Sequence, residues 1–228
     1  LPANIKNDEV HSHEGLTYGG LVTDKKNKTV ETFAAVDAIL EFLKNHQVKW
    51  LFLKMLPSFY ESGGNQETDY FLYQKGAVLH RKDLNLAMNL KEPLSVSKSK
   101  MKHFRKMSLQ GLSYVQTTDL ASFWNQVLIP CLAERYKANP VHSLQEIEKL
   151  HSLFPENIKH FSVFYKDEIV AGITIFETER VVKSQYGATT ATGRDFRALD
   201  YLFINLFEHY QKQGKSFFDM GTVNQNEG

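Results

Sequence analysis

The sequence has almost no cysteine: Cys131 is the one cysteine among 228 residues. A single cysteine excludes a disulfide framework within the chain and is typical of a reducing compartment, so we expect a cytoplasmic protein. Long apolar runs are missing as well, and none approaches the ~20 residues of a membrane span. The opening residues, LPANIKNDEV, do not have the charged and then apolar layout of a signal peptide. We therefore expect no transmembrane segment.

The chain also has little net charge, with 27 Lys and Arg against 26 Asp and Glu. Against this neutral background, the stretch SVSKSKMKHFRKMSLQG (95–111) is basic and contains no acidic residue. In a helix over 96–110, Lys98, Lys102 and Arg105 share one face. Cations in the first turn oppose the helix dipole by roughly 0.3–1 kcal/mol each, which stability alone would not favour. We interpret the face as a site for phosphates or RNA, with a solvated charged face as the equally weighted alternative.

An internal repeat organises the rest of the chain. Residues 17–47 and 185–211 each begin with Tyr-Gly and a small residue, and then carry Phe-x-Ala-aliphatic-Asp after a polar loop. The pattern predicts a strand–loop–helix–strand unit that occurs twice. Between the copies we expect the basic helix, two further helices and a three-strand meander. The order of elements predicts an α/β fold with a mixed sheet, not a repeating Rossmann pattern.

The Tyr-Gly pairs are candidates for a substrate cleft. Glycine in a strand removes side-chain bulk, so that a ligand can approach the backbone, although tight packing explains the same residues equally well. The hydroxyl of Tyr186 could donate a hydrogen bond to a carbonyl or an oxyanion. The residues that we assign to the cleft are Tyr18, Gly19, Gly20, Gln185 and Gly187.

One acidic residue and one loop are further candidates for a catalytic group and an anion-binding site. Asp219 ends the last predicted strand and could serve as a general base toward an amine, or instead cap the following loop. Thr192, Gly193 and Arg194 precede a helix and form a candidate anion site.

Other reactive residue types carry weaker signals. His11 and His13 lie two apart on a predicted strand, but no third ligand is evident, so we predict no metal site. Cys131 falls within the apolar series of its helix and is expected in the core. Glu177 lies at a predicted hairpin and is expected to be solvated.

Six short stretches resemble the FemABX-like acyltransferases of bacteria: SHEGLTYGGLV, SVSKSKMKHFRKMSLQGL, NPVHSLQEIEKLHSLFP, IVAGITIF, KSQYGATT and FFDMGT. The resemblance implies tandem halves with the GNAT-like (acyl-CoA N-acyltransferase) fold, which we place at 1–118 and 119–228. Family members have a further stretch before the first half and continue through a Lys- and Phe-containing strand after the second. We therefore expect the first half to lack its start and the second half its last strands.

The resemblance also implies the reaction, which is transfer of an acyl or aminoacyl group from an activated carrier to an amine. The carrier would be a charged tRNA or an acyl-CoA as co-substrate, with no tightly bound cofactor, and the acceptor a peptidoglycan precursor peptide. GNAT proteins that bind CoA have a Gln/Arg-x-x-Gly-x-Gly/Ala loop, which neither LVTDKKNKTVE nor ATTATGRDFR matches. Tyr186 and Asp219 would be catalytic, and the basic helix would hold the carrier. The rival interpretation is a non-catalytic module that binds RNA or an anionic ligand on the same fold.

Overall fold

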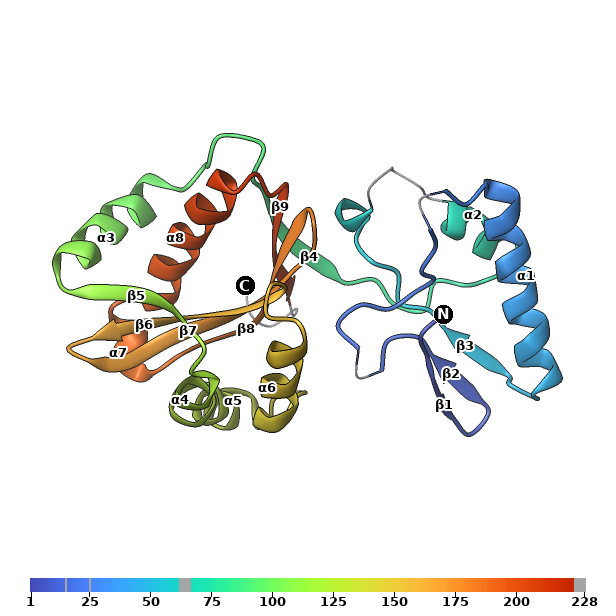
Figure 1. Ribbon diagram of the computed structural model, residues 1–228, viewed down its shortest axis with the longest axis horizontal. Helices are drawn as coiled ribbons and strands as arrows, with labels where there is room; N and C mark the ends of the chain where they lie inside the picture. Colours follow the sequence, from blue (N-terminus) through green and yellow to red (C-terminus); the bar gives the residue numbers. More distant parts are fainter. Residues whose placement is uncertain (15, 25, 62–66, 224–228) are drawn as a thin grey trace. The chain divides into compact units, whose positions relative to one another are not determined.

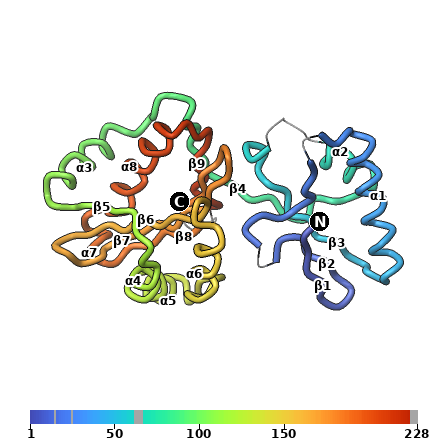
Figure 2. The backbone as a smooth tube through the Cα atoms, viewed as in Figure 1, coloured from blue at the N-terminus to red at the C-terminus, as the bar shows by residue number. Residues whose placement is uncertain are grey.

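The computed structural model describes residues 1–14, 16–24, 26–61 and 67–223. The chain forms two compact units, Leu1–Asp83 and Leu84–Gly228 (Figure 1, Figure 2). This boundary lies well before the one expected at 118/119, because residues 84–118 supply two strands and a helix to the second unit. The division into two GNAT-like halves stays a prediction.

The first unit is a three-stranded sheet with two helices. Its elements in chain order are β1 (Asn4–Lys6), β2 (Glu9–His11), α1 (Thr29–Asn45), β3 (Trp50–Phe52), the 3₁₀ turn η1 (Ser58–Tyr60) and α2 (Glu67–Gln74). The strand order is β1-β2-β3, with β1 antiparallel and β3 parallel to β2. Helix α1 is therefore the crossover that joins the parallel pair. The unit has a small apolar core, with Val10, Val36, Leu43 and Phe71 buried.

The second unit is a six-stranded mixed sheet covered by helices on both faces. Its elements are β4 (Leu84–Asn89), α3 (Lys98–Leu109), β5 (Leu112–Thr117), α4 (Leu120–Phe123), the π-helical turn η2 (Trp124–Leu128), α5 (Ile129–Tyr136), α6 (Leu144–Leu153), β6 (Ile158–Tyr165), β7 (Glu168–Glu177), β8 (Val181–Thr189), α7 (Ala191–Asp195), α8 (Ala198–Lys212) and β9 (Phe217–Val223). The strand order is β4-β9-β8-β7-β6-β5, and β8 and β9 are the parallel pair. In the described sheet β9 is an interior strand, because β4 pairs along its other side.

The main core lies between this sheet and the pair α3 and α8, which cover one face together (Figure 1). Helix α8 places Ala198, Leu202, Leu206 and Tyr210 on one face at four-residue spacing, and all four are buried. Helices α4, α5 and α6 lie on the opposite face of the sheet (Figure 1). The central strand β7 is buried from its second residue to its last, because helices cover both of its faces.

Several local predictions are confirmed. The basic stretch forms α3, whose N-cap residue Ser97 accepts a hydrogen bond from the Lys100 N–H at 3.3 Å. The three-strand meander is β6-β7-β8, and Lys166 and Asp167 turn its first hairpin with positive φ angles of 48° and 65°. Such angles are required at both central positions of a type I′ turn.

The internal repeat is confirmed in topology but not in register. In each unit an antiparallel strand pair leads into a strand–helix–parallel strand crossover, β2-α1-β3 in the first and β8-α8-β9 in the second. Tyr186 and Gly187 lie within β8, whereas Tyr18 and Gly19 lie in irregular chain after β2. The expected strand around residues 17–20 is therefore wrong.

Candidate functional site

The parallel strands β8 and β9 separate partway along their length. They pair only from Val181 with Phe217 to Lys183 with Asp219. Beyond that point β8 continues alongside β7, and β9 continues alongside β4. The ladder registers shift between Thr174 and Ile175 on β7 and between Leu86 and Ala87 on β4, which leaves Gln185 and Met220 as the extra residues of two β-bulges. Bulges bend a strand and increase its twist, so these two help the strands to diverge.

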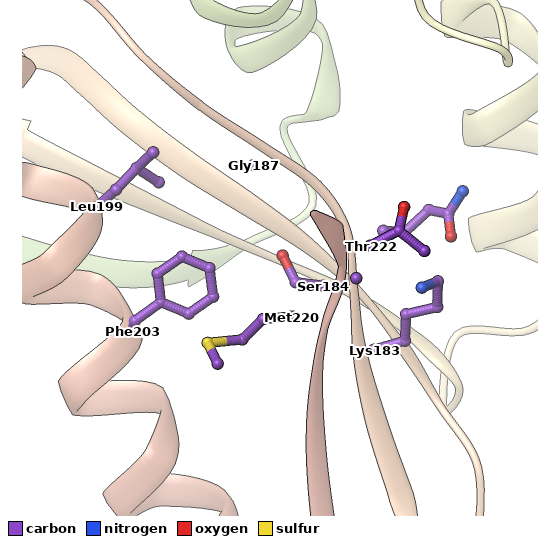
Figure 3. Close-up of a pocket in the computed structure, with 9 residues that line it drawn as sticks. Lys183, Ser184, Gly187, Leu199, Phe203, Met220 and Thr222 are labelled. Atoms are coloured by element: carbon purple, nitrogen blue, oxygen red, sulfur yellow. The ribbon is translucent and has the colours of Figure 1, made fainter. Parts of the chain in front are cut away.

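A cavity of about 380 Å³ occupies the gap between the two strands. Its lining residues are Lys183, Ser184, Gln185 and Gly187 from β8, Leu199 and Phe203 from α8, and Met220, Gly221 and Thr222 from β9. We call this cavity the β8–β9 cleft. Figure 3 shows Leu199, Phe203 and Met220 on the α8 side of the strands and Lys183 and Thr222 on the other side. The cleft therefore has one apolar wall and one polar wall, as is common in small-molecule sites.

A buried carboxylate lies where the strands separate. Asp219 is only 1% exposed. Its Oδ2 atom lies 3.2 Å from Lys183 Nζ, while Oδ1 accepts hydrogen bonds from Asn85 Nδ2 at 2.9 Å and from the Gly221 N–H at 2.7 Å. A carboxylate that is removed from water needs such partners to remain charged. Lys183 lines the cleft, whereas its partner Asp219 does not.

The second predicted catalytic residue, Tyr186, has a different neighbour. Its hydroxyl accepts a hydrogen bond from the His142 N–H at 3.1 Å and lies 2.5 Å from His142 Nδ1. The hydroxyl can donate to Nδ1 or accept from it, depending on the tautomer of the His142 ring. Burial raises the pKa of Tyr186, so the phenol stays neutral. Tyr186 is not among the residues that line the cleft, and its catalytic role stays a prediction.

Two cleft residues named from the sequence, Gln185 and Gly187, do line the cavity. Gln185 is the bulged residue, and its Oε1 atom is buried with no hydrogen-bond partner among the described residues. A Cβ built on Gly187 would lie 3.6 Å from Ser184 Oγ, so the glycine leaves room beside that hydroxyl. The structure thus brings Gln185, Gly187 and the Asp219–Lys183 pair to one place.

The glycines of the first repeat copy serve close backbone packing. A Cβ on Gly19 would lie 2.7 Å from the carbonyl oxygen of Ser12. Gly20 has a φ of +91°, and its N–H donates to Ser12 Oγ at 3.3 Å. The ring of Tyr18 packs edge-on against Tyr60 with centroids 5.6 Å apart. These contacts support the packing explanation for this stretch, and its substrate role stays a prediction.

The candidate anion loop is also tightly packed. A Cβ on Gly193 would overlap Thr189 Oγ1 and the carbonyl oxygen of Val170. The Gly193 N–H donates to the Thr190 hydroxyl at 3.1 Å, so this amide already has an acceptor. The neighbouring Thr192 and Arg194 are exposed, and Arg194 lies 3.8 Å from Glu134. Packing alone accounts for the glycine, and anion binding at this loop stays a prediction.

The basic face of α3 is open to solvent. Lys98, Lys102 and Arg105 are exposed, and the described residues offer none of them a carboxylate within 4.0 Å. Lys100, in contrast, pairs with Asp200 of α8 at 2.9 Å. Asp200 directly follows Leu199, which lines the cleft. The pair therefore links the basic helix to the helix that forms the apolar wall.

One sequence prediction away from the cleft is wrong. Glu177 was expected to be solvated at a hairpin, but it is buried at 7% exposure. Its carboxylate accepts the Tyr210 hydroxyl at 2.7 Å and pairs with Lys159 at 3.1 Å and Lys215 at 3.2 Å. Glu177 is buried because β7 extends as far as this residue and places it beside Tyr210 of α8. The two lysines offset the loss of hydration of the carboxylate.

The remaining reactive side chains have structural surroundings. Cys131 is buried in α5, as expected. His11 stacks on Phe52 and pairs with Glu9 at 3.0 Å. Across the described residues, no three His, Cys, Asp or Glu side chains are grouped so as to hold a metal ion. In the same part of the chain, no helix is both long and apolar enough to cross a bilayer.

Sequence reasoning missed most of the polar wall. Lys183 and Thr222 look like ordinary strand residues, since the divergence that exposes them depends on pairing between distant segments. The same is true of Ser184, whose side chain lies on the α8 side of the strands (Figure 3). Leu199 and Phe203 have the spacing of one face of an amphipathic helix, and they pack toward the sheet. Their second role at the edge of a cavity had no signal in the sequence.

No family model matches the sequence, and no curated protein matches it. Solved structures do match in fold. The C-terminal domain (DUF2156) of a protein assigned as a lysylphosphatidylglycerol synthetase from Agrobacterium fabrum has a TM-score of 0.70 at 12% identity, over 97% of this chain and 66% of that chain. L-PGS from Bacillus licheniformis has a TM-score of 0.68 at 12% identity, over 98% and 65%. FemX has a TM-score of 0.66 at 11% identity, over 96% and 73%.

These likenesses establish the fold and confirm the predicted mixed α/β, GNAT-like acyltransferase architecture. FemX is among the similar structures, which agrees in outline with the FemABX-like resemblance, but two of the three are lysylphosphatidylglycerol synthetases by name. The chain spans just under two thirds of the length of the first two.

Proposed function

We propose that the protein is an acyltransferase that moves an acyl or aminoacyl group from an activated carrier to an amine, and that the reaction takes place in the β8–β9 cleft. The observation that carries this proposal is the separation of two parallel strands around a cavity with an apolar wall and a polar wall. Acyl transfer suits such a site, because it needs positioning and stabilisation of a developing oxyanion more than it needs covalent catalysis.

The backbone of β8 supports binding of an extended donor. Beyond Lys183, the side of β8 that faces β9 has no ladder partner in the described sheet. The amino group and the carbonyl of an aminoacyl donor could hydrogen-bond to these backbone groups, as part of an added strand would. Leu199, Phe203 and Met220 would cover its apolar part, and the reacting carbonyl would face the polar wall.

The charged surface supports a polyanionic carrier. Lys98, Lys102 and Arg105 are exposed on α3, and the Lys100–Asp200 pair ties that helix to α8 beside the cleft. A charged tRNA would place its phosphates on α3 and its aminoacyl end in the cleft. We favour this carrier over acyl-CoA, because the chain has no match to the CoA-binding loop. The proposed acceptor is the amine of a cell-wall precursor peptide, and the similarity to L-PGS adds a lipid headgroup as the acceptor to compare with it.

The test is transfer of a radiolabelled group by the purified protein. Aminoacyl-tRNAs and acyl-CoAs serve as donors, and peptide amines and phosphatidylglycerol vesicles serve as acceptors. We expect product from aminoacyl-tRNA with an amine acceptor. Retention of tRNA with no product from any acceptor would favour the non-catalytic RNA-binding module instead. Product from acyl-CoA alone would refute the carrier assignment and leave the transferase assignment intact.

A further inference from the structure

The cation closest to the point of strand separation is Lys183. It pairs with Asp219 at the last position where β8 and β9 are joined, and the cleft opens directly beyond. Its side chain is 20% exposed and lines the cavity, while the Asp219 side chain is 2% exposed. The ammonium group is therefore held at the base of the cleft with one side turned toward the space that a ligand would fill.

The hydrogen bonds around Asp219 hold that ammonium group in place. Asn85 on β4 and the Gly221 N–H on β9 both donate to Oδ1, which leaves Oδ2 for Lys183 on β8. Three strands thus fix the orientation of one carboxylate. Asp219 is nearly inaccessible and both of its oxygens have partners, so it is poorly placed to accept a proton from a substrate.

We propose that Lys183 is the anion-stabilising catalytic residue of the cleft, and that Asp219 is its positioning residue and not a general base. The proposal rests on the proposed function, which it deepens by assigning the group that stabilises the transition state. A fixed cation in a partly dry site stabilises negative charge more than it would in water, and it needs no reorganisation during the reaction.

The proposed transfer is an addition of the amine to the carrier carbonyl, followed by elimination of the carrier. The lone pair of the neutral acceptor amine forms a bond to the carbonyl carbon of the carrier ester or thioester, and the C=O π electrons move to oxygen. The resulting oxyanion lies against the Lys183 ammonium group. When the C=O bond re-forms, the bond to the carrier oxygen or sulfur breaks, and that atom leaves with the electron pair. The amine nitrogen loses one proton, which the departing carrier atom takes up directly or through water.

The kinetic test has a matched control in the same unit, in the turn between α8 and β9. Lys215 pairs with buried Glu177 at 3.2 Å and its side chain is 16% exposed, so it resembles Lys183 in setting but does not line the cleft. We expect Lys183→Met to lower kcat by about 10²–10³-fold with little change in KM, because an oxyanion contact forms only in the transition state. Lys183→Arg should recover part of the loss. Lys215→Met should lower the melting temperature and leave kcat unchanged.

The Asp219→Asn variant separates the two roles of the carboxylate. A positioning role predicts a lower kcat with an unchanged shape of the pH profile of kcat/KM. A general-base role predicts loss of the acidic limb of that profile. Equal kcat in Lys183→Met and the wild type would overturn the proposal, as would an effect confined to KM, which would mean ground-state binding.

A binding test decides the proposal even if no transfer is detected. Methylphosphonate, a small tetrahedral anion, is titrated into ¹⁵N-labelled protein while amide signals are followed by NMR. We expect saturable shifts at Ser184 and Thr222 that disappear in Lys183→Met and persist in Lys215→Met. Equal shifts in Lys183→Met, or no shifts in the wild type, refute the assignment of Lys183. Absence of transfer beside a normal phosphonate response would count against the proposed function alone.

Discussion

Salt dependence of carrier binding tests the basic face of α3 directly. The perturbation is replacement of Lys98, Lys102 or Arg105 by Ala, singly and together. All three are exposed on one helix face without a carboxylate partner in the described chain, so each is available to a phosphate. Lys100 in the same helix is the matched control, because its charge is already paired with Asp200 at 2.9 Å.

The expected magnitude follows from counterion release. Each phosphate that is neutralised on a single strand contributes about −0.7 to the slope of log K against log salt. Each single replacement should therefore reduce the slope magnitude by about 0.7, and the triple replacement by about 2. Lys100→Ala should change the slope much less, because its charge is engaged within the protein.

The free energy of unfolding of the same variants should not follow their salt slopes. Lys98 is the first residue of α3, where a cation opposes the helix dipole. Removing it should leave the free energy of unfolding unchanged or raise it by up to about 1 kcal/mol. Lys100→Ala should instead lower it by up to about 1 kcal/mol, because an exposed ion pair is lost.

The assay is fluorescence anisotropy with labelled tRNA at four or more salt concentrations, beside urea titrations of every variant. A constant salt slope across the three single variants, combined with reduced stability, would show that the stretch is a structural surface. The tRNA assignment would then be abandoned. Equal slope changes in Lys100→Ala and Lys102→Ala would also contradict the reasoning, because they would mean that the Asp200 pair does not occupy Lys100.

Gly193→Ala would drive a Cβ into the carbonyl oxygen of Val170, so urea titration should show a loss of about 1–3 kcal/mol, and wild-type stability would contradict this packing. Burial lowers the pKa of His160 from 6.5 to about 3, so the unfolded chain binds more protons between these values. Stability should therefore fall by up to about 1.4 kcal/mol per pH unit as pH drops from 6.5 toward 3, and the fall should be shallower in His160→Gln. Tyr186→Phe leaves the His142 N–H without its acceptor and should cost about 1–2 kcal/mol; we also predict reduced turnover with an unchanged salt slope, and full turnover would restrict Tyr186 to a structural role.

The fold could be predicted from the sequence wherever local chemistry determines it. Ser143 and Glu146 form a capping box at the start of α6, and Lys166 and Asp167 turn the first hairpin of the expected meander. The apolar spacing within residues 196–206 predicts the helix α8, although its fully buried face is that of Ala198, Leu202, Leu206 and Tyr210. These features depend on neighbours within about four residues, so a single sequence contains the required information.

The site could be predicted only in part, because it depends on long-range pairing. Gln185 and Gly187 were named from an unusual strand composition, and Asp219 from an expected strand end, although β9 continues past it to Val223. Lys183 was missed, since nothing in VVKSQYG indicates where β8 leaves β9. The boundary between the compact units, at 83/84, also depends on such pairing, because the pairing of β4 with β9 joins segments more than 120 residues apart.

The separation of β8 from β9 has a consequence for how such a protein can evolve. A cleft that arises where two strands part is shaped by the course of the main chain, and many combinations of side chains are compatible with it. Selection can then change almost every residue around the gap while the gap itself is inherited. In a chain of this kind, sequence similarity to related proteins should become undetectable long before similarity of the fold does. This accounts for a sequence that matches no family model and no curated protein but shares its architecture with solved structures at 11–12% identity. Under the proposed function, a change of acceptor would then require new side chains on the polar wall and no change in topology.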